Sequence, residues 1–340
     1  MGAAHSTGFS WSMIRQSPSN RVRTPWSRTQ TGVAMVTALL IVAIATSAAA
    51  FISLGQQVWL RQAQNLFDAA QAKAVRSGAL DWAAIILAED AKDNTTDDLT
   101  QLWAQPLPPL PAEGGLVTGR IIDAQSRFNL NNVVRNGNPS TEDIAVLQRL
   151  LDAQDLPREL ADTLVDWLDA DSQTQPNGAE DIDYLSTEQP YRAANQRLQT
   201  VQELRLIKGF DAKAVDLLRP FVTALPQPTA ININTAEPAV FGAMFVDLSL
   251  SEAEELLAQR KENPFKDTSE FKARLPPDVA PPQVPYDVKS AYFEVTIDSL
   301  FGRLQRRTQA LLHRPAKGSV QVLWQQQQLL ITASDDDDTG

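Results

Sequence analysis

An uncharged apolar run near the N-terminus limits the possible folds of this chain more than any other feature. Residues 33–54 contain no Asp, Glu, Lys or Arg. As a helix rising about 1.5 Å per residue, this run is long enough to cross a hydrocarbon core of about 30 Å. The preceding residues hold no acid and four arginines, Arg15, Arg21, Arg23 and Arg28. The positive-inside bias therefore predicts a cytoplasmic N-terminus and an exported remainder.

A cleaved secretory signal is the alternative interpretation of this run. Such a signal has a shorter apolar region of about 7 to 15 residues and a cleavage site rich in small residues on its far side. The stretch "TSAAAF" (46–51) offers such a site. However, apolar residues continue at helical spacing from Leu54 through Leu66 to Ile86. The sequence therefore predicts one long helix, apolar all round in its first half and amphipathic in its second.

Composition excludes several classes of function. The formal net charge is -11 and no basic stripe is evident, which argues against a nucleic-acid partner. The chain has no cysteine, so disulfides, thiolate metal sites and a cysteine nucleophile are excluded. His5 and His313 are the two histidines, too few and too badly placed for a histidine triad or a zinc site.

The order of the remaining patterns indicates a domain inserted into a sheet. A linker rich in proline and glycine, "QPLPPLPAEGG" (105–115), precedes a predicted β-hairpin over 117–130. Helical patterns then follow, beginning with capped helices in 140–156 and 157–171. After residue 287 the chain alternates again and predicts three antiparallel strands. We expect these strands to complete the sheet that 117–130 begins, with the helices between.

An acidic run lies inside the helical part. Seven acids and no Lys or Arg occur between residues 162 and 183. Crowded carboxylates repel one another unless a cation joins them, and hard oxygen ligands on a flexible loop suit Ca²⁺. Asp169, Asp171 and Glu180 occupy positions one, three and twelve of an EF-hand-like loop, although Thr174 stands where that loop requires glycine. A well-hydrated helix end and loop is the alternative interpretation.

Several long blocks together resemble one protein family. They are "GVAMVTALLIVAIAT" (32–46), "RIIDAQSRFNLNN" (120–132), "DWLDADSQTQPNGAEDIDYLSTEQPYRAANQRLQTVQELRLIKGF" (166–210), "ININTA" (231–236) and "SAYFEV" (290–295). In order and content they resemble the minor pseudopilin K family of type II secretion, within the type IV pilin-like superfamily. The resemblance runs from about residue 32 to 325.

The resemblance implies an α+β, pilin-like fold. A long N-terminal helix would pack on a small antiparallel sheet, with a large all-helical domain inserted between strands. The expected parts are a cytoplasmic leader (1–32), a transmembrane and assembly helix (33–54), a pilin-like domain in two pieces (55–134 and 285–328), the inserted helical domain with its acidic loop (135–284) and an acidic disordered tail (329–340).

The resemblance also implies particular sites. Prepilin peptidase would cut after Gly32, and Val33 would become the N-methylated terminus. Thr37 stands at the fifth mature position, where most of the family has a Glu that pairs with a neighbour's terminal amine; a subunit without it suits the end of a fibre. The family binds calcium in the insertion. The expected calcium ligands are Asp169, Asp171, Asn177, Glu180, Asp181 and Asp183.

The function implied by the resemblance is that of a non-enzymatic tip subunit of the pseudopilus. It would form a complex with minor pseudopilins I and J, contact the major pseudopilin and other secretion components, and help to start assembly. It would be anchored by one helix in the inner membrane, with its C-terminal domain in the periplasm. The alternative is a membrane-tethered hydrolase with a metal at the acidic cluster, which lacks histidines and a nucleophile motif. A DNA-uptake factor is a third possibility, which the acidic charge disfavours.

Overall fold

The computed structural model describes residues 30–112, 115–301 and 304–329. The chain divides into two compact units, Met1–Gln64 and Asn65–Gly340. Most of the predicted leader, and the predicted tail from residue 330, lie outside the described residues. The two units are described separately below.

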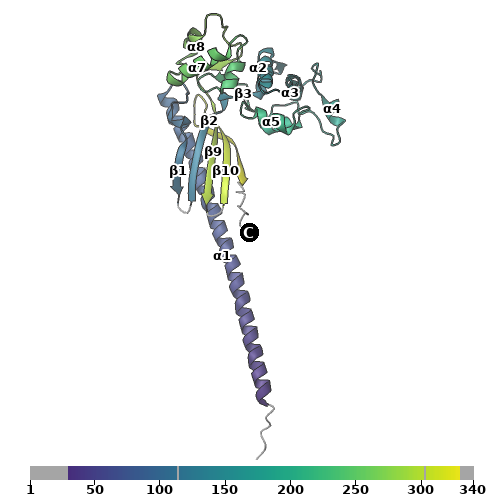
Figure 1. Ribbon diagram of the computed structural model, residues 1–340, viewed down its shortest axis with the longest axis vertical. Helices are drawn as coiled ribbons and strands as arrows, with labels where there is room; N and C mark the ends of the chain where they lie inside the picture. The colour runs from purple at the N-terminus through teal and green to yellow at the C-terminus, as the bar shows by residue number, and fades with distance from the viewer. Residues whose placement is uncertain (1–29, 113–114, 302–303, 330–340) are drawn as a thin grey trace, which may run out of the picture. The chain divides into compact units, whose positions relative to one another are not determined.

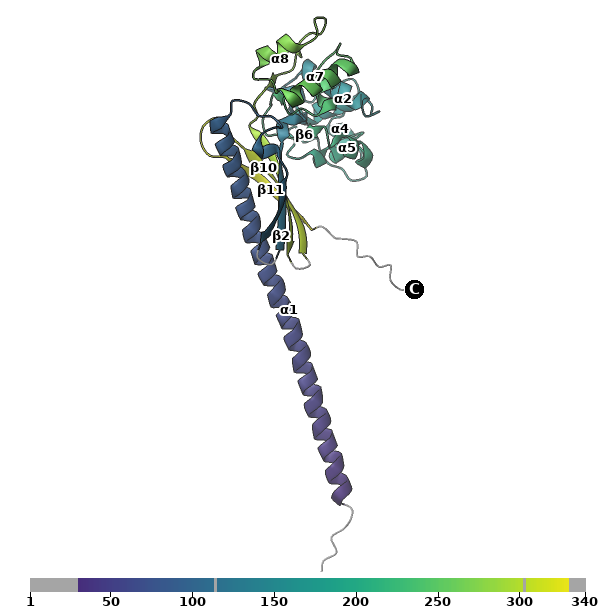
Figure 2. The same ribbon diagram turned by 60° about the vertical axis from the view of Figure 1, so that its left-hand side comes forward.

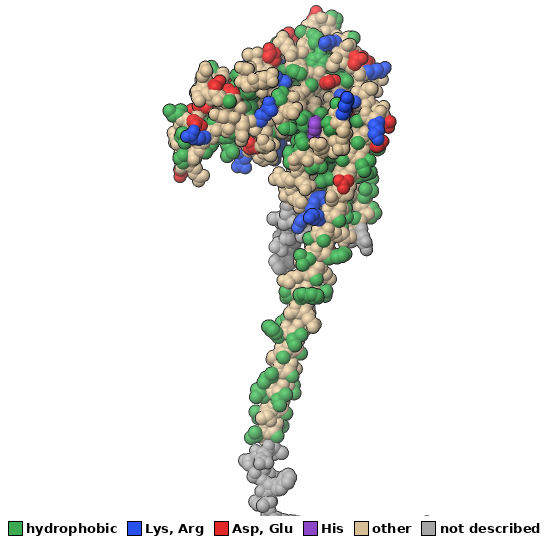
Figure 3. Space-filling view, turned by 180° about the vertical axis from the view of Figure 1, so that it is seen from behind, with side chains coloured by type: hydrophobic (Ala, Val, Ile, Leu, Met, Phe, Trp, Pro, Cys, Tyr) green, Lys and Arg blue, Asp and Glu red, His purple; other side chains and the backbone are tan. Residues whose placement is uncertain are grey.

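A single helix, α1 (Gln30–Asp93), begins the described chain. In the first unit its apolar side chains are exposed, Val33 by 66% and Leu39 by 61%, and Figure 3 shows hydrophobic side chains along this stretch. By length and composition, α1 can cross a membrane. The Thr37 hydroxyl donates to the carbonyls of Val33 and Ala34, 3.0 and 2.9 Å away. This polar group is therefore satisfied within the helix, which reduces its cost in lipid.

In the second unit, the end of α1 packs on a five-stranded antiparallel sheet whose order is β1-β2-β9-β10-β11 (Figure 1). The strands are β1 (Leu107–Ala112), β2 (Gly115–Asp123), β9 (Tyr292–Phe301), β10 (Leu304–His313) and β11 (Gln321–Leu329). Alternate residues of β2 and β9, such as Val117, Ile121 and Val295, join the buried face of α1 in one core. We call these strands together with residues 65–93 of α1 the sheet domain.

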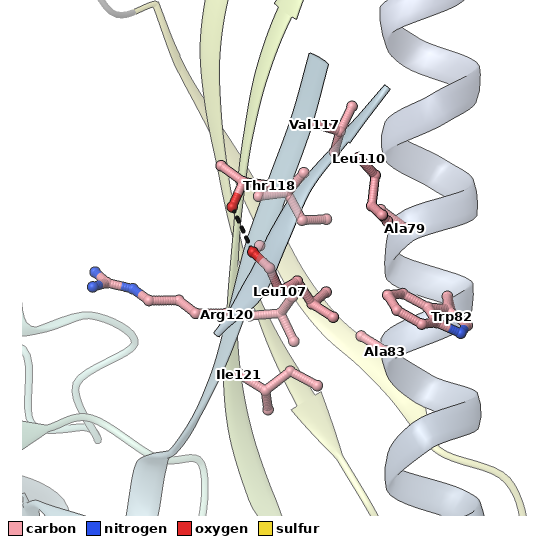
Figure 4. A pocket seen from close by; sticks show the side chains of 12 residues that line it. Ala79, Trp82, Ala83, Leu107, Leu110, Val117, Thr118, Arg120 and Ile121 are labelled. Atoms are coloured by element: carbon pink, nitrogen blue, oxygen red, sulfur yellow. Dashed lines mark hydrogen bonds between the residues drawn. The ribbon is translucent and has the colours of Figure 1, made fainter. Parts of the chain in front are cut away.

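The N-terminal edge of the sheet differs from the sequence prediction. The predicted hairpin over 117–130 is wrong, because β2 ends at Asp123 and pairs with β1, the segment predicted to be a linker. Proline is tolerated here because β1 is an edge strand and needs few ladder hydrogen bonds, and its register shifts between Leu107 and Leu110. Figure 4 shows Leu107 and Leu110 extending toward Ala79 and Trp82 of α1, around a cavity of about 40 Å³. Apolar contact with the helix therefore holds this proline-rich edge.

The three strands predicted after residue 287 are confirmed as β9, β10 and β11. β2 and β9 are sheet neighbours, with Ile121 opposite Val295, although the whole inserted segment separates them in the sequence. The structure therefore places an insertion between two adjacent strands, as expected.

The inserted segment, residues 124–291, folds as a mostly helical domain, which we call the inserted domain. Its α-helices are α2 (Thr141–Asp152), α3 (Leu160–Leu168), α4 (Asp181–Leu185), α5 (Ala212–Leu218), α6 (Pro238–Ala243), α7 (Leu250–Glu262) and α8 (Thr268–Arg274). The 3-10 helices of the second unit are η1 (Leu102–Ala104), η2 (Ala124–Ser126), η3 (Leu130–Val133) and η4 (Val201–Leu206). The inserted domain also contains two-residue strands: β3 (Phe128–Asn129), β4 (Val134–Arg135), β5 (Asn138–Pro139), β6 (Val222–Thr223), β7 (Ile231–Asn232) and β8 (Tyr286–Asp287).

The boundaries of the insertion lie outside the predicted ones, 135 and 284. Phe128, Leu130 and Val133 are fully buried in the core of the inserted domain, and β3 pairs in parallel with β6. Residues 124–134 therefore belong to the insertion rather than to the sheet. The reason is the buried polar side chain of Asn129, whose amide donates to Gln227 O and whose carbonyl accepts from Leu225 N. Such tertiary hydrogen bonds leave no pattern in the sequence.

The inserted domain adjoins the end of the sheet at which α1 ends, as Figures 1 and 2 show. Asp123, the last residue of β2, is buried and accepts hydrogen bonds from Ser290 Oγ and Asn232 Nδ2 at 2.6 and 2.9 Å. Ser290 also donates its backbone N–H to Asp97, just after α1, at 2.7 Å. The chain leaves the sheet after Asp123 and returns to it after Ser290. Hydrogen bonds thus tie both points to the segment that follows α1.

Candidate metal centre in the acidic loop

Two helices, α3 and α4, position the acidic loop. α3 buries Leu164, Val165 and Leu168 in the core of the inserted domain and ends at Leu168. The backbone N–H of the next residue, Asp169, still bonds Val165 O at 3.0 Å. α4 begins after Glu180, whose backbone N–H donates to Asp183 Oδ2 at 3.3 Å. The loop 170–179 therefore runs from one helix C-terminus to the next helix N-terminus. Because the helix dipole disfavours acids at a C-terminus, Asp169 lies in an unfavourable field unless a cation is present.

The structure brings together three of the predicted ligands. Carboxylate oxygens of Asp169, Asp171 and Glu180 lie within 4.8 Å of one another. Asp169 is 3% exposed and Glu180 is 6% exposed, whereas Asp171 is open to solvent. These are the three residues that the EF-hand-like spacing selects at positions one, three and twelve. We call them the carboxylate triad.

Two buried oxygens of the carboxylate triad have no hydrogen-bond partner, Asp169 Oδ1 and Glu180 Oε1. Unpaired buried carboxylate oxygens are rare because desolvation is costly, so each needs a partner that protein atoms do not supply here. A hard cation such as Ca²⁺ takes carboxylate oxygens as ligands. The residues of the triad therefore fit a calcium ion.

The electrostatics of the metal-free loop are unfavourable. Burial, and then the charges of Asp171 and Asp166, raise the pKa of Asp169 to about 6. Burial, and then the charges of Asp166 and Asp169, raise the pKa of Glu180 to about 7. Both shifts indicate carboxylates that are destabilised in their charged form, the situation that a bound cation reverses.

Asp166 organises the loop, a role that the sequence prediction did not assign. It is fully buried and accepts from Gln175 N with both oxygens, at 3.1 and 3.2 Å. Gly178 lies against it so closely that a Cβ there would be 1.8 Å from Asp166 Oδ2. A residue with a side chain at position 178 would therefore clash with the Asp166 carboxylate. The three-residue spacing between Asp166 and Asp169 was the available sequence signal.

The other predicted ligands have different partners. Asp181 accepts from Ala193 N at 3.0 Å and pairs with Arg192 at 3.2 Å. Asp183 pairs with Lys208 at 2.7 Å, and the hydrogen bond from Lys208, together with its charge, lowers the pKa of Asp183. Asn177 donates its amide to Asp162 at 3.0 Å. The structure therefore places Asn177, Asp181 and Asp183 outside the carboxylate triad, with their side chains used to fix the surrounding loop.

The processing residues lie on α1. Gly32 and Val33 are exposed in the first turns of the helix, and no atom lies within 4 Å of a Cβ built on Gly32. Cleavage between them remains a prediction.

Known proteins resemble this chain over most of its length. Two family profiles described as "Type II secretion system (T2SS), protein K" match residues 126–227 and 231–289. The type II secretion system protein K of Pseudomonas aeruginosa is 35% identical over 309 residues, covering 87% of this chain and 92% of that protein. The protein K of Pectobacterium carotovorum subsp. carotovorum is 31% identical over 316 residues, covering 87% of this chain and 96% of that protein.

A solved structure shares the fold. A chain in the crystal structure of the GspK-GspI-GspJ complex from the enterotoxigenic Escherichia coli type 2 secretion system aligns with a TM-score of 0.69 and 27% identity. The alignment covers 78% of this chain and 99% of that chain. The α+β fold, with a long helix, a small sheet and a helical domain, is thereby confirmed. The relatives are named as a secretion-system component, which confirms the expectation that this chain is not an enzyme. The chain therefore belongs to the protein K family of the type II secretion system, the pseudopilin family that its sequence resembles.

Proposed function

We propose that this chain is the minor pseudopilin at the tip of the type II secretion pseudopilus, that it joins minor pseudopilins I and J there, and that it helps to start assembly for export of folded proteins. The apolar part of α1 anchors the precursor in the inner membrane, with the leader in the cytoplasm and the C-terminal domain in the periplasm. The related GspK occurs in a complex with GspI and GspJ, which supports the same partners here.

The position of the inserted domain carries this proposal. It adjoins the end of the sheet domain at which α1 ends, and the buried hydrogen bonds of Asp123 and Ser290 fix it there. In a fibre built by packing such helices side by side, a further subunit would have to add above that end. The inserted domain occupies this space, so the chain suits the terminal position and not the middle of the fibre.

A co-purification experiment tests the proposal. The full chain, in detergent, is mixed with minor pseudopilins I and J of the same system, with either major pseudopilin or buffer added. We expect a stable complex with I and J. When the major pseudopilin is added, we expect no subunit to bind above this chain, at the end of the sheet domain where α1 ends. A chain that stays monomeric with I and J under all conditions would refute the tip assignment.

We also propose that the carboxylate triad holds a calcium ion. The two unpartnered buried oxygens of Asp169 and Glu180 are the observation that supports it. Bound calcium would neutralise the acidic loop and hold it in place in a chain without disulfides. We expect calcium to raise the melting temperature of the full chain and EGTA to reverse the rise, whereas an unchanged melting temperature in both would refute the metal site.

A further inference from the structure

The face of the sheet that points away from α1 carries a cleft of about 320 Å³. Side chains alternate along each strand, so Arg120, Glu294 and Trp324 lie on this face, opposite the core beneath α1. Figure 4 shows the Arg120 side chain extending away from α1. The inserted domain supplies the other wall of the cleft, with residues 199–202, Arg219 and strand β6 among those that line it.

The cleft is basic in a chain that is acidic overall. The chain has 41 acids and 30 lysines and arginines, yet the charged residues that line the cleft are three arginines and one acid: Arg120, Arg127, Arg219 and Glu294. Glu294 is paired with Arg127, at 2.9 Å. Arg219 is exposed and pairs with the exposed Asp216 at 2.8 Å, and exposed pairs of this kind are worth about 0 to 1 kcal/mol. Arg219 can therefore exchange this partner for another carboxylate. We call this cleft the arginine cleft.

Arg120 is the accessible charge of the arginine cleft that lacks an acid. Its side chain is exposed, and no ion pair or side-chain hydrogen bond joins it to another of the described residues. The two acids diagonal to it on β9 are Glu294 and Asp298, which pair instead with Arg127 and Arg307. A carboxylate from outside the sheet can therefore bind Arg120 without displacing an existing pair.

A run of four aspartates, Asp335–Asp338, follows strand β11 in the sequence and lies outside the described residues. β11 passes the arginine cleft at Trp324 and Gln326, which line it, and ends at Leu329. The three residues from Gln326 to Leu329 span about 10 Å of strand. The six residues from 330 to 335 can extend over about 20 Å, so the aspartates can return along β11 as far as the cleft.

We propose that Asp335–Asp338 bind in the arginine cleft, with their carboxylates on Arg120 and Arg219. Hydrogen bonds between a carboxylate and a guanidinium are charge-assisted and can be bidentate. Because the aspartates are tethered to β11, their effective concentration at the cleft is about millimolar, so contacts of modest strength suffice. Bound there, the run links the open face of the sheet to the inserted domain. This inference depends neither on the secretion partners nor on calcium.

Cross-linking tests the proposal, because the chain has no cysteine of its own. Thr339→Cys, which keeps all four aspartates, is combined in the full chain with Gln326→Cys. The matched control pair uses Gln325→Cys, because Gln325 is equally exposed on β11 but lies opposite Ala310, on the face toward α1. Disulfide formation under mild oxidation in detergent is followed by mass spectrometry. We expect the Gln326 pair to form at least tenfold faster than the Gln325 pair.

Charge variants show what produces the difference. In about 1 M sodium chloride, where exposed charges are screened beyond about 3 Å, we expect the two rates to approach each other. Arg120→Gln with Arg219→Gln should have the same effect, whereas Arg205→Gln should not, because Arg205 is an exposed arginine of η4 that does not line the cleft. Replacement of all four aspartates by asparagine should also remove the difference.

Other results overturn the inference. Equal rates for the Gln325 and Gln326 pairs in the otherwise unchanged chain would show that the run does not bind on this face. A faster Gln326 pair that persists in the double arginine variant would show that the arginines do not hold it. If a free tetra-aspartate peptide binds the chain in an Arg120-dependent manner while the two rates are equal, the cleft takes an acidic segment of another molecule.

Discussion

Asp97 and Arg314 form a buried ion pair that joins the end of α1 to the end of β10. Arg314 Nη2 lies 2.6 and 2.5 Å from the two carboxylate oxygens of Asp97, and neither side chain is more than 4% exposed. Arg314 also lies 4.6 Å from the ring centre of Phe293, and Asp97 accepts from Ser290 N at the return from the inserted domain. One ion pair thus links the helix, the sheet and the insertion.

Loss of one partner of this pair should be costly, because the other charge then remains buried and unpaired. We expect Arg314→Met to lower the free energy of unfolding by about 3 to 5 kcal/mol. The matched control is Arg307→Met, which breaks the partly exposed pair with Asp298 and should cost about 1 kcal/mol or less. Urea unfolding of both variants measures the difference, and equal losses would contradict the importance assigned to Arg314.

Gly178 should be required at its position because of the Asp166 carboxylate. A Cβ at residue 178 would lie 1.8 Å from Asp166 Oδ2, so Gly178→Ala must displace the side chain that holds the loop. We expect a loss of about 1 to 3 kcal/mol in stability and at least tenfold weaker calcium binding. Gly242→Ala is the control, because no atom lies within 4 Å of its Cβ in α6, and it should leave both unchanged within about 1 kcal/mol. Calorimetry of both variants gives the comparison.

The ligand set of the acidic loop is tested by amide substitutions. Glu180→Gln and Asp169→Asn remove a charge from the carboxylate triad, so each should abolish the rise in melting temperature that calcium produces. Asp181→Asn should retain most of it, because Asp181 faces Arg192 and Ala193. If Asp181→Asn also abolished the calcium effect, Asp181 would be a ligand, as the sequence had predicted.

Calcium stabilisation should decrease at low pH. Because the pKa values of Asp169 and Glu180 are raised to about 6 and 7, the folded metal-free chain binds more protons than the unfolded chain between about pH 4 and 7. Its stability therefore falls as the pH rises through this range. Calcium must displace these protons, so its effect is largest above pH 7 and small at pH 5.

Melting temperatures with and without calcium at pH 8, 6.5 and 5 measure this dependence. The metal-free chain is prepared by dialysis, because EGTA binds calcium poorly in acid. A calcium effect of the same size at all three values would contradict the protonation of the triad.

The mature N-terminus can be determined by mass spectrometry of the chain purified from membranes. We expect a terminus at Val33 after removal of the leader, and retention of the leader when Gly32 is replaced by a bulky residue. A terminus near Ala50 would indicate secretory signal cleavage and would remove the anchor.

Elements whose signal is local could be predicted from the amino-acid sequence. The apolar run 33–54 and its amphipathic continuation predicted α1, because a helix repeats its faces along the chain. Alternation after residue 287 predicted β9 to β11, and Ser140 capped α2 as expected, accepting from Asp143 N. The spacing of Asp169, Asp171 and Glu180 was sufficient to place three carboxylates together.

Tertiary structure decided everything that depends on partners distant in the sequence. A proline-rich segment became edge strand β1 because β2 and α1 lie beside it. Residues 124–134 belong to the inserted domain because Asn129 bonds the backbone of Leu225. Asp181 and Asp183 lie outside the carboxylate triad, where they pair with Arg192 and Lys208. Arg76 looks in the sequence like an ordinary charge on a helix. Only the packing of α1 on the sheet shows that it is buried and that its Nη1 has no hydrogen-bond partner among the described residues. Such contacts join residues that no local pattern relates, since burial and pairing are set by the whole folded chain.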